Sequence, residues 1–333
     1  MRLRTVLFFW VSFTFFNLPV FAKYEEVDRL SRAIKGKDLE NTHKQLEKIG
    51  QDDEMKARAF FTWITENIRY DVVEYKNPNP NHEKQQAVQV FKNKKGVCEG
   101  YSNLFKAFCE LSGIACHVVG GHCRELGKYV PEGHAWNTVM INGDWRLVDV
   151  TWGAGVLNES GKYEKAFNES YFFTPPTVFI EDHYAFDPAW QLVHYPVKLS
   201  DYRKPNWKYQ TDPNVPRYNY ADTIVQWLGM DTTAKIIAGA SRVLRFNYGE
   251  RKVKESVEPD LFNLTSNLIY QGSVLLVRYA ENNVAEDLES AQAFFKIASE
   301  CISLMGIPSP HLRKNVEEMK SAIKEYSKLS VKK

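Results

Sequence analysis

The dipeptide Asn142-Gly143 separates two short apolar segments, residues 137–141 and 145–150. Asn-Gly between such segments is the strongest short-range signal of a two-residue β-hairpin, because both turn positions need a positive φ. A two-residue turn also fixes the strand register, since the residues on either side of it must then face each other. The sequence therefore predicts an antiparallel sheet around this turn.

Helical periodicity precedes the hairpin. We expect an amphipathic helix over residues 55–68 and a second one over 98–111, which Gly113 ends. A buried strand is expected at 115–119. The apolar stripe of the first helix, which we expect to pack into the core, is Phe60, Trp63, Ile64 and Ile68. Because helices come first and strands follow, the chain is predicted to have an α+β fold with an antiparallel sheet.

The hairpin register also places a histidine near a carboxylate. Position 134 pairs with position 151 if the strands continue, and Asp149 lies two residues from that position on the same face. Asp149 shares its face with Trp145 and Leu147, where an unpaired carboxylate is costly. An imidazole oriented by an acid is the general base of a nucleophile–base–acid triad.

Cys98 is expected at the beginning of the helix that runs to residue 111. The N–H groups and partial positive charge at a helix N-terminus favour a thiolate and can hold an oxyanion. A lone cysteine is usually a small core residue, and a lone strand histidine is usually structural. It is the combination of Cys98, His134 and Asp149 that indicates nucleophilic catalysis.

The order of these motifs resembles the transglutaminase-like superfamily of papain-related folds, and within it a secreted branch similar to kyphoscoliosis peptidase. The resemblance covers about residues 55–195, and its segments are 63–71, 95–102, 113–114, 133–137, 145–152 and 183–192. It implies that Cys98 is the nucleophile, His134 the general base and acid, and Asp149 the orienting carboxylate. It does not determine the reaction, because members hydrolyse amides, cross-link glutamine to amines, or have lost catalysis.

A side chain from upstream completes the oxyanion hole in such a site. Tyr70, at the exit of the helix over 55–68, is our candidate, with Trp63 and Gln89 as alternatives. Core packing explains Trp63 more simply, because this residue belongs to the apolar stripe.

Five cysteines follow residue 22, at positions 98, 109, 116, 123 and 301. An odd number leaves at least one thiol unpaired within the monomer in an oxidising compartment, and the pairing of the others stays open. A zinc site is an alternative use of Cys109, Cys116, His117, His122, Cys123 and His134. Structural zinc sites usually contain closely spaced pairs such as Cys-x-x-Cys, which this group lacks, so we expect no metal and no other cofactor.

Residues 1–22 predict a signal peptide with cleavage near Ala22: a short basic start precedes the apolar run Val6–Phe16. That run is shorter than the ~20 apolar residues that span a bilayer, although an uncleaved anchor or a buried helix is the alternative. Cleavage leaves 41 basic and 41 acidic residues. We therefore expect a secreted or periplasmic protein without a basic face for nucleic acid and without stable membrane insertion.

The remaining chain is expected to contain two domains. Residues 23–195 form the catalytic domain with its core at 55–195, residues 196–219 a proline-rich linker, and residues 220–333 a helical domain. The helices expected in the last domain cover 221–240, 260–280, 285–305 and 311–329.

These observations together predict a secreted cysteine enzyme that acts on amide or peptide bonds through a thioester on Cys98. The partner is a protein or peptide substrate. We favour hydrolysis because the sequence indicates neither a calcium site nor an amine pocket. Protein-glutamine cross-linking and a non-catalytic binding module on the same scaffold are the alternatives.

Overall fold

The computed structural model describes residues 20–77, 79–158, 160–212, 214–306 and 308–330. The chain divides into two compact units. Unit 1 contains the chain up to Ala115 together with Val150–Phe172, and unit 2 contains Cys116–Asp149 and the chain from Phe173 onward. Residues 1–19 of the predicted signal peptide lie outside the described residues. The units do not coincide with the domain bounds expected at 195 and 219, which stay a prediction.

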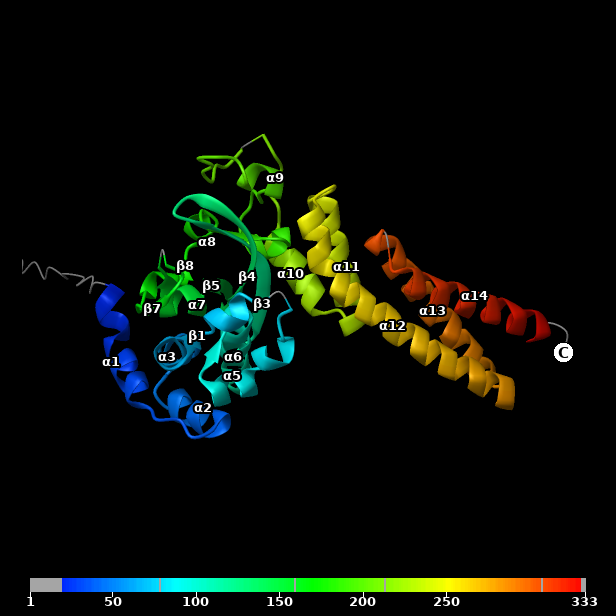
Figure 1. The fold of residues 1–333 in the computed structure, drawn as a ribbon, viewed down its shortest axis with the longest axis horizontal. Helices are drawn as coiled ribbons and strands as arrows, with labels where there is room; N and C mark the ends of the chain where they lie inside the picture. Colours follow the sequence, from blue (N-terminus) through cyan, green and yellow to red (C-terminus); the bar gives the residue numbers. More distant parts are fainter. Residues whose placement is uncertain (1–19, 78, 159, 213, 307, 331–333) are drawn as a thin grey trace, which may run out of the picture. The chain divides into compact units, whose positions relative to one another are not determined.

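Unit 1 is mainly helical (Figure 1). Its helices are α1 (Val20–Ala33), α2 (Leu39–Glu47), α3 (Asp53–Asn67), α4 (Val72–Tyr75), η1 (His82–Gln85), α5 (Ala87–Asn93), α6 (Cys98–Leu111), α7 (Val150–Ala154) and η2 (Glu169–Tyr171). Its strands are β1 (Arg69–Tyr70) and β2 (Lys95–Gly96), which pair in parallel, and β6 (Gly155–Leu157) and β7 (Tyr163–Lys165), which pair antiparallel. Helices α3 and α6 confirm the two helices predicted for this region.

The apolar stripe of α3 lies in the core of unit 1, as expected. Trp63 is fully buried, stacks on Phe91 with 5.4 Å between ring centroids, and donates its indole N–H to the carbonyl of Ile34 at 3.2 Å. The same helix buries Arg58, whose guanidinium makes two hydrogen bonds of 2.8 and 2.7 Å to Asp28. A buried charge is tolerated there because it is paired and hydrogen-bonded.

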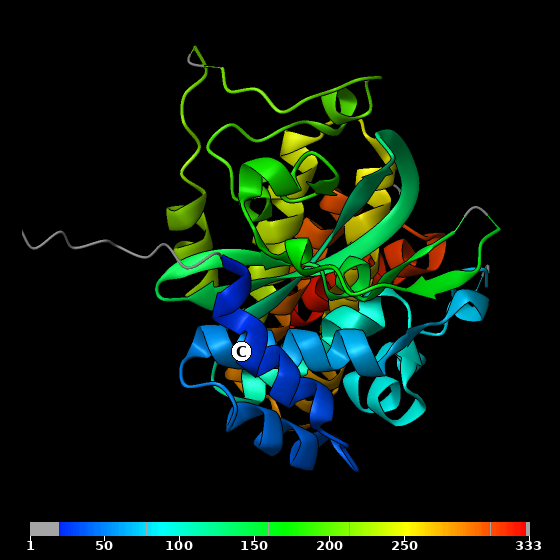
Figure 2. The same ribbon diagram turned by 90° about the vertical axis from the view of Figure 1, so that its left-hand side faces the viewer.

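Unit 2 contains a sheet with the strand order β8-β5-β4-β3-β9, and the long β3–β4 hairpin is its curved ribbon in Figure 2. The strands are β3 (Cys116–Glu125), β4 (Lys128–Ile141), β5 (Asp144–Val148), β8 (Phe172–Thr174) and β9 (His183–Ala185). The turn has φ values of 53° at Asn142 and 87° at Gly143, and Ile141 faces Asp144 as predicted. The α+β fold with an antiparallel sheet is confirmed.

The second strand of this hairpin ends earlier than expected. Its last pair is Asn137 with Val148, and α7 begins at Val150. Position 134 therefore does not pair with position 151, and Asp149 occupies the junction between strand and helix.

The rest of unit 2 is helical. Its helices are α8 (Pro176–Phe179), η3 (Pro188–Gln191), α9 (Leu199–Tyr202), α10 (Tyr220–Leu228), α11 (Thr232–Phe246), α12 (Arg251–Asn282), α13 (Ala285–Met305) and α14 (Pro310–Ser330). Figure 1 shows α12, α13 and α14 side by side, and they share one apolar core. The single helix expected over 221–240 is wrong, because Asp231 accepts the backbone N–H of Ala234 at 2.9 Å and so begins a new helix.

Part of the predicted linker packs into the core of unit 2. Leu199 and Tyr202 are fully buried and pack with Tyr184. The side-chain oxygen of Asn247 accepts the N–H of Leu199 at 3.1 Å and the hydroxyl of Tyr184 at 2.7 Å. Residues 196–219 are therefore not an exposed linker along their whole length, because the short helix α9 contributes side chains to the core of unit 2. Among the described helices, none is long and apolar enough to cross a membrane.

The buried environment of His122 predicts that the stability of the folded chain depends on pH. Its ring is buried and lies against Tyr129 and Phe186, and burial, with smaller contributions from Lys252 and Arg203, lowers its pKa from 6.5 to about 4. The unfolded chain therefore binds a proton below pH 6.5 that the folded chain accepts only near pH 4. Stability from this residue is complete above pH 6.5 and is lost as the pH falls toward 4.

Between pH 7 and pH 5, the free energy of unfolding should fall by about 2 kcal/mol less in His122→Gln than in the wild type, measured by urea unfolding. His82→Gln is the control, because the His82 side chain is 72% exposed. Equal pH dependence in His122→Gln and the wild type would contradict the assignment.

Candidate functional site

One buried carboxylate in unit 2 contacts two histidines. Nε2 of His134, on β4, lies 2.6 Å from Oδ2 of Asp149, and Nε2 of His183, at the start of β9, lies 3.0 Å from the same oxygen. Asp149 is fully buried, and the side chain of His134 is 11% exposed. The structure thus brings together His134 and Asp149, although the strand pairing that was expected to place them ends at Asn137 and Val148. Their catalytic roles stay predictions.

The charges in this group favour an ionised carboxylate. Burial alone raises the pKa of Asp149, but hydrogen bonds and charge interactions with His134 and His183 outweigh it and hold the pKa well below its usual range. An ionised carboxylate only accepts hydrogen bonds, so Nε2 of His134 is the donor. Nδ1 is then the ring nitrogen with which His134 would exchange a proton.

His183 is a member of this group that sequence reasoning missed. Its Nδ1 lies 2.6 Å from Oδ1 of Asp182, so both ring nitrogens face carboxylates. The ring of Phe179 stacks on it at 3.9 Å between centroids, and Trp136 contacts it edge to face at 5.2 Å. These contacts hold the fully buried ring in one orientation. The sequence showed residue 183 only as part of the closing segment 183–192.

Cys98 is the first residue of α6 in unit 1, as predicted. Its side chain is partly exposed, and its thiol is free of any disulfide. The preceding residue, Val97, donates its N–H to Oε1 of the buried Gln85 at 3.0 Å. A Cβ on Gly100 would lie 2.5 Å from that oxygen, so glycine is required for this close packing. Gln85 thus supports the N-terminus of α6, a role for which the sequence carried no signal.

Tyr70 lies on the strand beside the one that leads into α6. In the β1–β2 pair it is in register with Gly96, two residues before Cys98. Its half-buried ring lies 5.7 Å from that of Tyr75. Of the two alternatives, Trp63 packs in the core and Gln89 is exposed on α5. Of the three candidates, Tyr70 is the one that lies on a strand paired with the strand leading to Cys98.

The predicted triad is divided between the units. Cys98 belongs to unit 1, whereas His134 and Asp149 belong to unit 2. The approach of the thiol to the imidazole therefore stays a prediction.

The six residues of the zinc alternative are dispersed. His117 stacks on Trp190 with 4.5 Å between centroids, His122 packs against Tyr129, and the Cys116 sulfur accepts a hydrogen bond from Asn137 at 3.6 Å. Cys123 and His134 do approach each other, and His183, which was not among the six, joins them. None of the five cysteines, Cys301 included, forms a disulfide, so no disulfide pairing is assigned.

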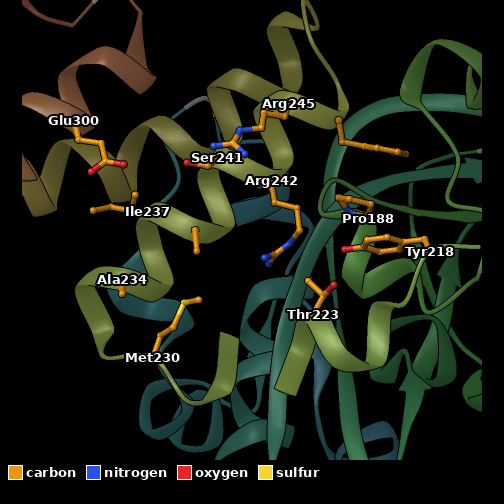
Figure 3. Close-up of a pocket in the computed structure, with 12 residues that line it drawn as sticks. Pro188, Tyr218, Thr223, Met230, Ala234, Ile237, Ser241, Arg242, Arg245 and Glu300 are labelled. Atoms are coloured by element: carbon orange, nitrogen blue, oxygen red, sulfur yellow. The ribbon is translucent and has the colours of Figure 1, made fainter. Parts of the chain in front are cut away.

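A separate cavity of about 830 Å³ in unit 2 is lined by residues of η3, α10, α11 and α13 (Figure 3). Arg242 on its wall is held by Asp187 through two hydrogen bonds of 2.7 and 2.6 Å. The described residues that line it include no cysteine, so this cavity supplies no thiol nucleophile.

Comparison with known proteins shows which family this sequence resembles. Residues 40–150 match the family model of the transglutaminase-like superfamily. Human kyphoscoliosis peptidase is 33% identical over 171 residues, which cover 49% of this chain and 24% of that protein. Hillarin of Drosophila melanogaster is 28% identical over 220 residues, which cover 57% of this chain and 25% of that protein. The chain thus spans about a quarter of the length of these relatives.

A solved structure described as a TGase matches this chain with a TM-score of 0.30 and 17% identity. The match covers 48% of this chain and 38% of the solved one. The resemblance to the transglutaminase-like superfamily and to kyphoscoliosis peptidase, expected from the motifs, is confirmed by the family model and by the named relatives.

Proposed function

We propose that this chain, whose residues 40–150 match the family model of the transglutaminase-like superfamily, is a cysteine enzyme that acts on amide bonds of proteins or peptides. The observation that carries the proposal is the 2.6 Å hydrogen bond that turns Nε2 of His134 toward Asp149. An imidazole oriented by a buried acid is the base that a thiol nucleophile requires. Cys98, partly exposed at a helix N-terminus, is the nucleophile of the proposal.

In the proposed reaction, Nδ1 of His134 takes the thiol proton of Cys98, and the sulfur attacks the amide carbonyl carbon. The N–H groups at the beginning of α6 stabilise the oxyanion, with Tyr70 as the second donor. His134 then gives the proton to the departing nitrogen, the C–N bond breaks, and a thioester remains. Asp149 stays ionised throughout and stabilises the imidazolium that forms in between.

We propose that water resolves the thioester, which makes the protein a peptidase or amidohydrolase. An amine in place of water would produce a cross-link, and a chain that carries out neither step would be a binding module. The three outcomes share the same scaffold and differ in the acceptor that reaches the thioester.

Incubation with a glutamine-containing peptide and a labelled primary amine tests the choice. We expect the deamidated or cleaved peptide to exceed the amine-linked peptide, measured by mass spectrometry of the same samples. Cys98→Ala is the control and should give neither product. Amine-linked peptide in excess of the deamidated and cleaved peptide would assign acyl transfer instead. Slow Cys98 labelling by an electrophile, equal in the wild type and in His134→Ala, would assign the binding module.

We further propose that the protein is exported, so that it meets its substrate outside the cytoplasm, in the periplasm or the surrounding medium. The basic start and the apolar run within residues 1–22 support this proposal. Cleavage near Ala22 would leave a chain without net charge, which favours a protein or peptide over a nucleic acid as partner. N-terminal sequencing of the mature protein should begin at Lys23, and a start at Met1 would contradict export by cleavage.

A further inference from the structure

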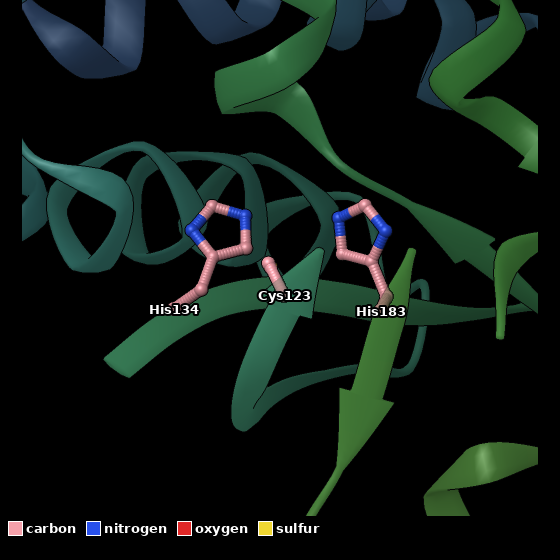
Figure 4. A group of neighbouring side chains, drawn as sticks. All are labelled: Cys123, His134 and His183. Carbon is pink, nitrogen blue, oxygen red and sulfur yellow. The ribbon is translucent and has the colours of Figure 1, made fainter. Parts of the chain in front are cut away.

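The thiol of Cys123 lies beside the two histidines that contact Asp149. Cys123 is in register with His183 across the β3–β9 pair and with Val130 across the β3–β4 pair. One ligand atom from each of Cys123, His134 and His183 lies within 4.8 Å of the other two. Figure 4 shows Cys123 between the two imidazole rings. Three strands thus bring one sulfur and two nitrogens to one place.

Asp149 adds an oxygen to this group. Its Oδ2 lies 2.6 Å from Nε2 of His134 and 3.0 Å from Nε2 of His183. Donor atoms at zinc bond lengths lie roughly 3.4 Å apart around a tetrahedral ion. Widening the two nitrogen–oxygen contacts to this separation would make room for an ion between the two imidazoles and the carboxylate, beside Cys123.

The surroundings of His183 match those of a metal-binding histidine. Metal ligands of this type almost always donate their second ring N–H to a carboxylate or carbonyl, which fixes the ring. Nδ1 of His183 lies 2.6 Å from Asp182, while Nε2 points into the group. Stacking on Phe179 further restricts the ring. The ligand orientation is thus maintained by contacts outside the group itself.

We propose that Cys123, His134, His183 and Asp149 bind Zn²⁺, and that the bound ion switches the enzyme off. The thiolate and the carboxylate supply two negative charges, which balance a divalent cation at this buried position. Sulfur and imidazole donors select zinc over magnesium or calcium, which prefer oxygen. Binding requires the thiolate of Cys123 and an unprotonated Nε2 of His183.

The ion and catalysis compete for one side chain. Zn²⁺ takes the lone pair of Nε2 of His134, so the proton of that ring moves to Nδ1. A protonated Nδ1 accepts no proton from Cys98, and the ring loses its hydrogen bond to Asp149. This switch rests on the proposed function, whereas metal binding itself does not.

Cobalt is the probe for the site in the full mature protein. One Co²⁺ per chain should give a thiolate-to-cobalt absorption band that Zn²⁺ abolishes by displacement. Cys123→Ser should lose the band, and His183→Gln should weaken binding on the order of 10–100-fold or more. Cys116→Ser is the matched control, because Cys116 is a second buried cysteine of β3 and should keep the band. A band that is lost in Cys98→Ala and kept in Cys123→Ser would overturn the site, as would the absence of a band in the wild type.

The switch is tested by electrophile labelling of Cys98 with and without Zn²⁺. Labelling of the metal-free wild type reports the proposed function alone, and its failure leaves the cobalt result intact. We expect Zn²⁺ to slow labelling in the wild type. At the same Zn²⁺ concentration, Cys123→Ser should label as fast as it does without metal, and the same inhibition of this variant should require on the order of 100-fold more Zn²⁺. Equal inhibition of the two proteins would overturn the switch.

Discussion

Cys98→Ala is expected to lower kcat/KM for a peptide amide by about 10³-fold or more, and His134→Ala by a similar factor. The double variant should be no worse than either single one, because a nucleophile without its base and a base without its nucleophile both leave only the binding and oxyanion contributions. The measurement is kcat/KM for the four proteins of this cycle. Multiplicative losses in the double variant would show that the two residues act independently and would contradict the triad.

The control for this cycle is Cys109→Ala. Cys109 lies on the same helix as Cys98 but is fully buried, so its replacement tests general disturbance of α6. We expect this variant to keep activity while losing some stability to the cavity that it creates. If activity falls equally in Cys109→Ala and Cys98→Ala, the loss reports damage to the helix and not removal of a nucleophile.

The parts of the fold that were predictable depend on local signals. Asn142-Gly143 determines its own turn, and the register of Ile141 with Asp144 follows from it. The approach of His134 to Asp149 could be inferred because both residues lie within eight positions of that turn, just beyond the last pair of the hairpin. The same holds for α3, α6 and α13, in which apolar spacing and end signals agree.

Long-range packing explains what the sequence did not reveal. His183 reaches Asp149 because β9 pairs with β3, and no local pattern specifies a pairing between segments about 60 residues apart. Leu199 and Tyr202 are buried by contact with residues of β9 and of helices far along the chain. A proline-rich segment with few apolar residues resembles a linker until its partners are known.

The cluster of Cys123, His134 and His183 shows the same limit for ligand motifs. Spacing rules detect metal sites whose ligands come from one turn or one pair of turns. Here the donors come from three strands, and the six residues grouped by proximity in the sequence are mostly apart in space. Sheet topology, and not spacing, assembles this site.

Asp149→Asn is expected to lower kcat by about 10⁴-fold with little change in KM, because an amide keeps the shape of the side chain but stabilises neither the donor tautomer nor the imidazolium of His134. The variant should also be less stable at neutral pH. The folded-state pKa of Asp149 lies below its usual range, so its stabilising contribution is present above the unfolded pKa of about 3.9. That contribution is lost as the pH falls through the folded value.

The stability difference between wild type and Asp149→Asn should therefore persist from pH 7 to about pH 5 and narrow only at lower pH, measured by urea unfolding across that range. Asp144→Asn is the matched control on the same hairpin, because its side chain is 71% exposed and pairs with Arg146. A surface pair of this kind contributes little, so this variant should match the wild type in kcat and in stability. A loss of stability in Asp149→Asn without a loss of kcat would show that Asp149 has only a structural role. A carboxylate that only held the strands together would leave the protonation of His134, and therefore kcat, unchanged.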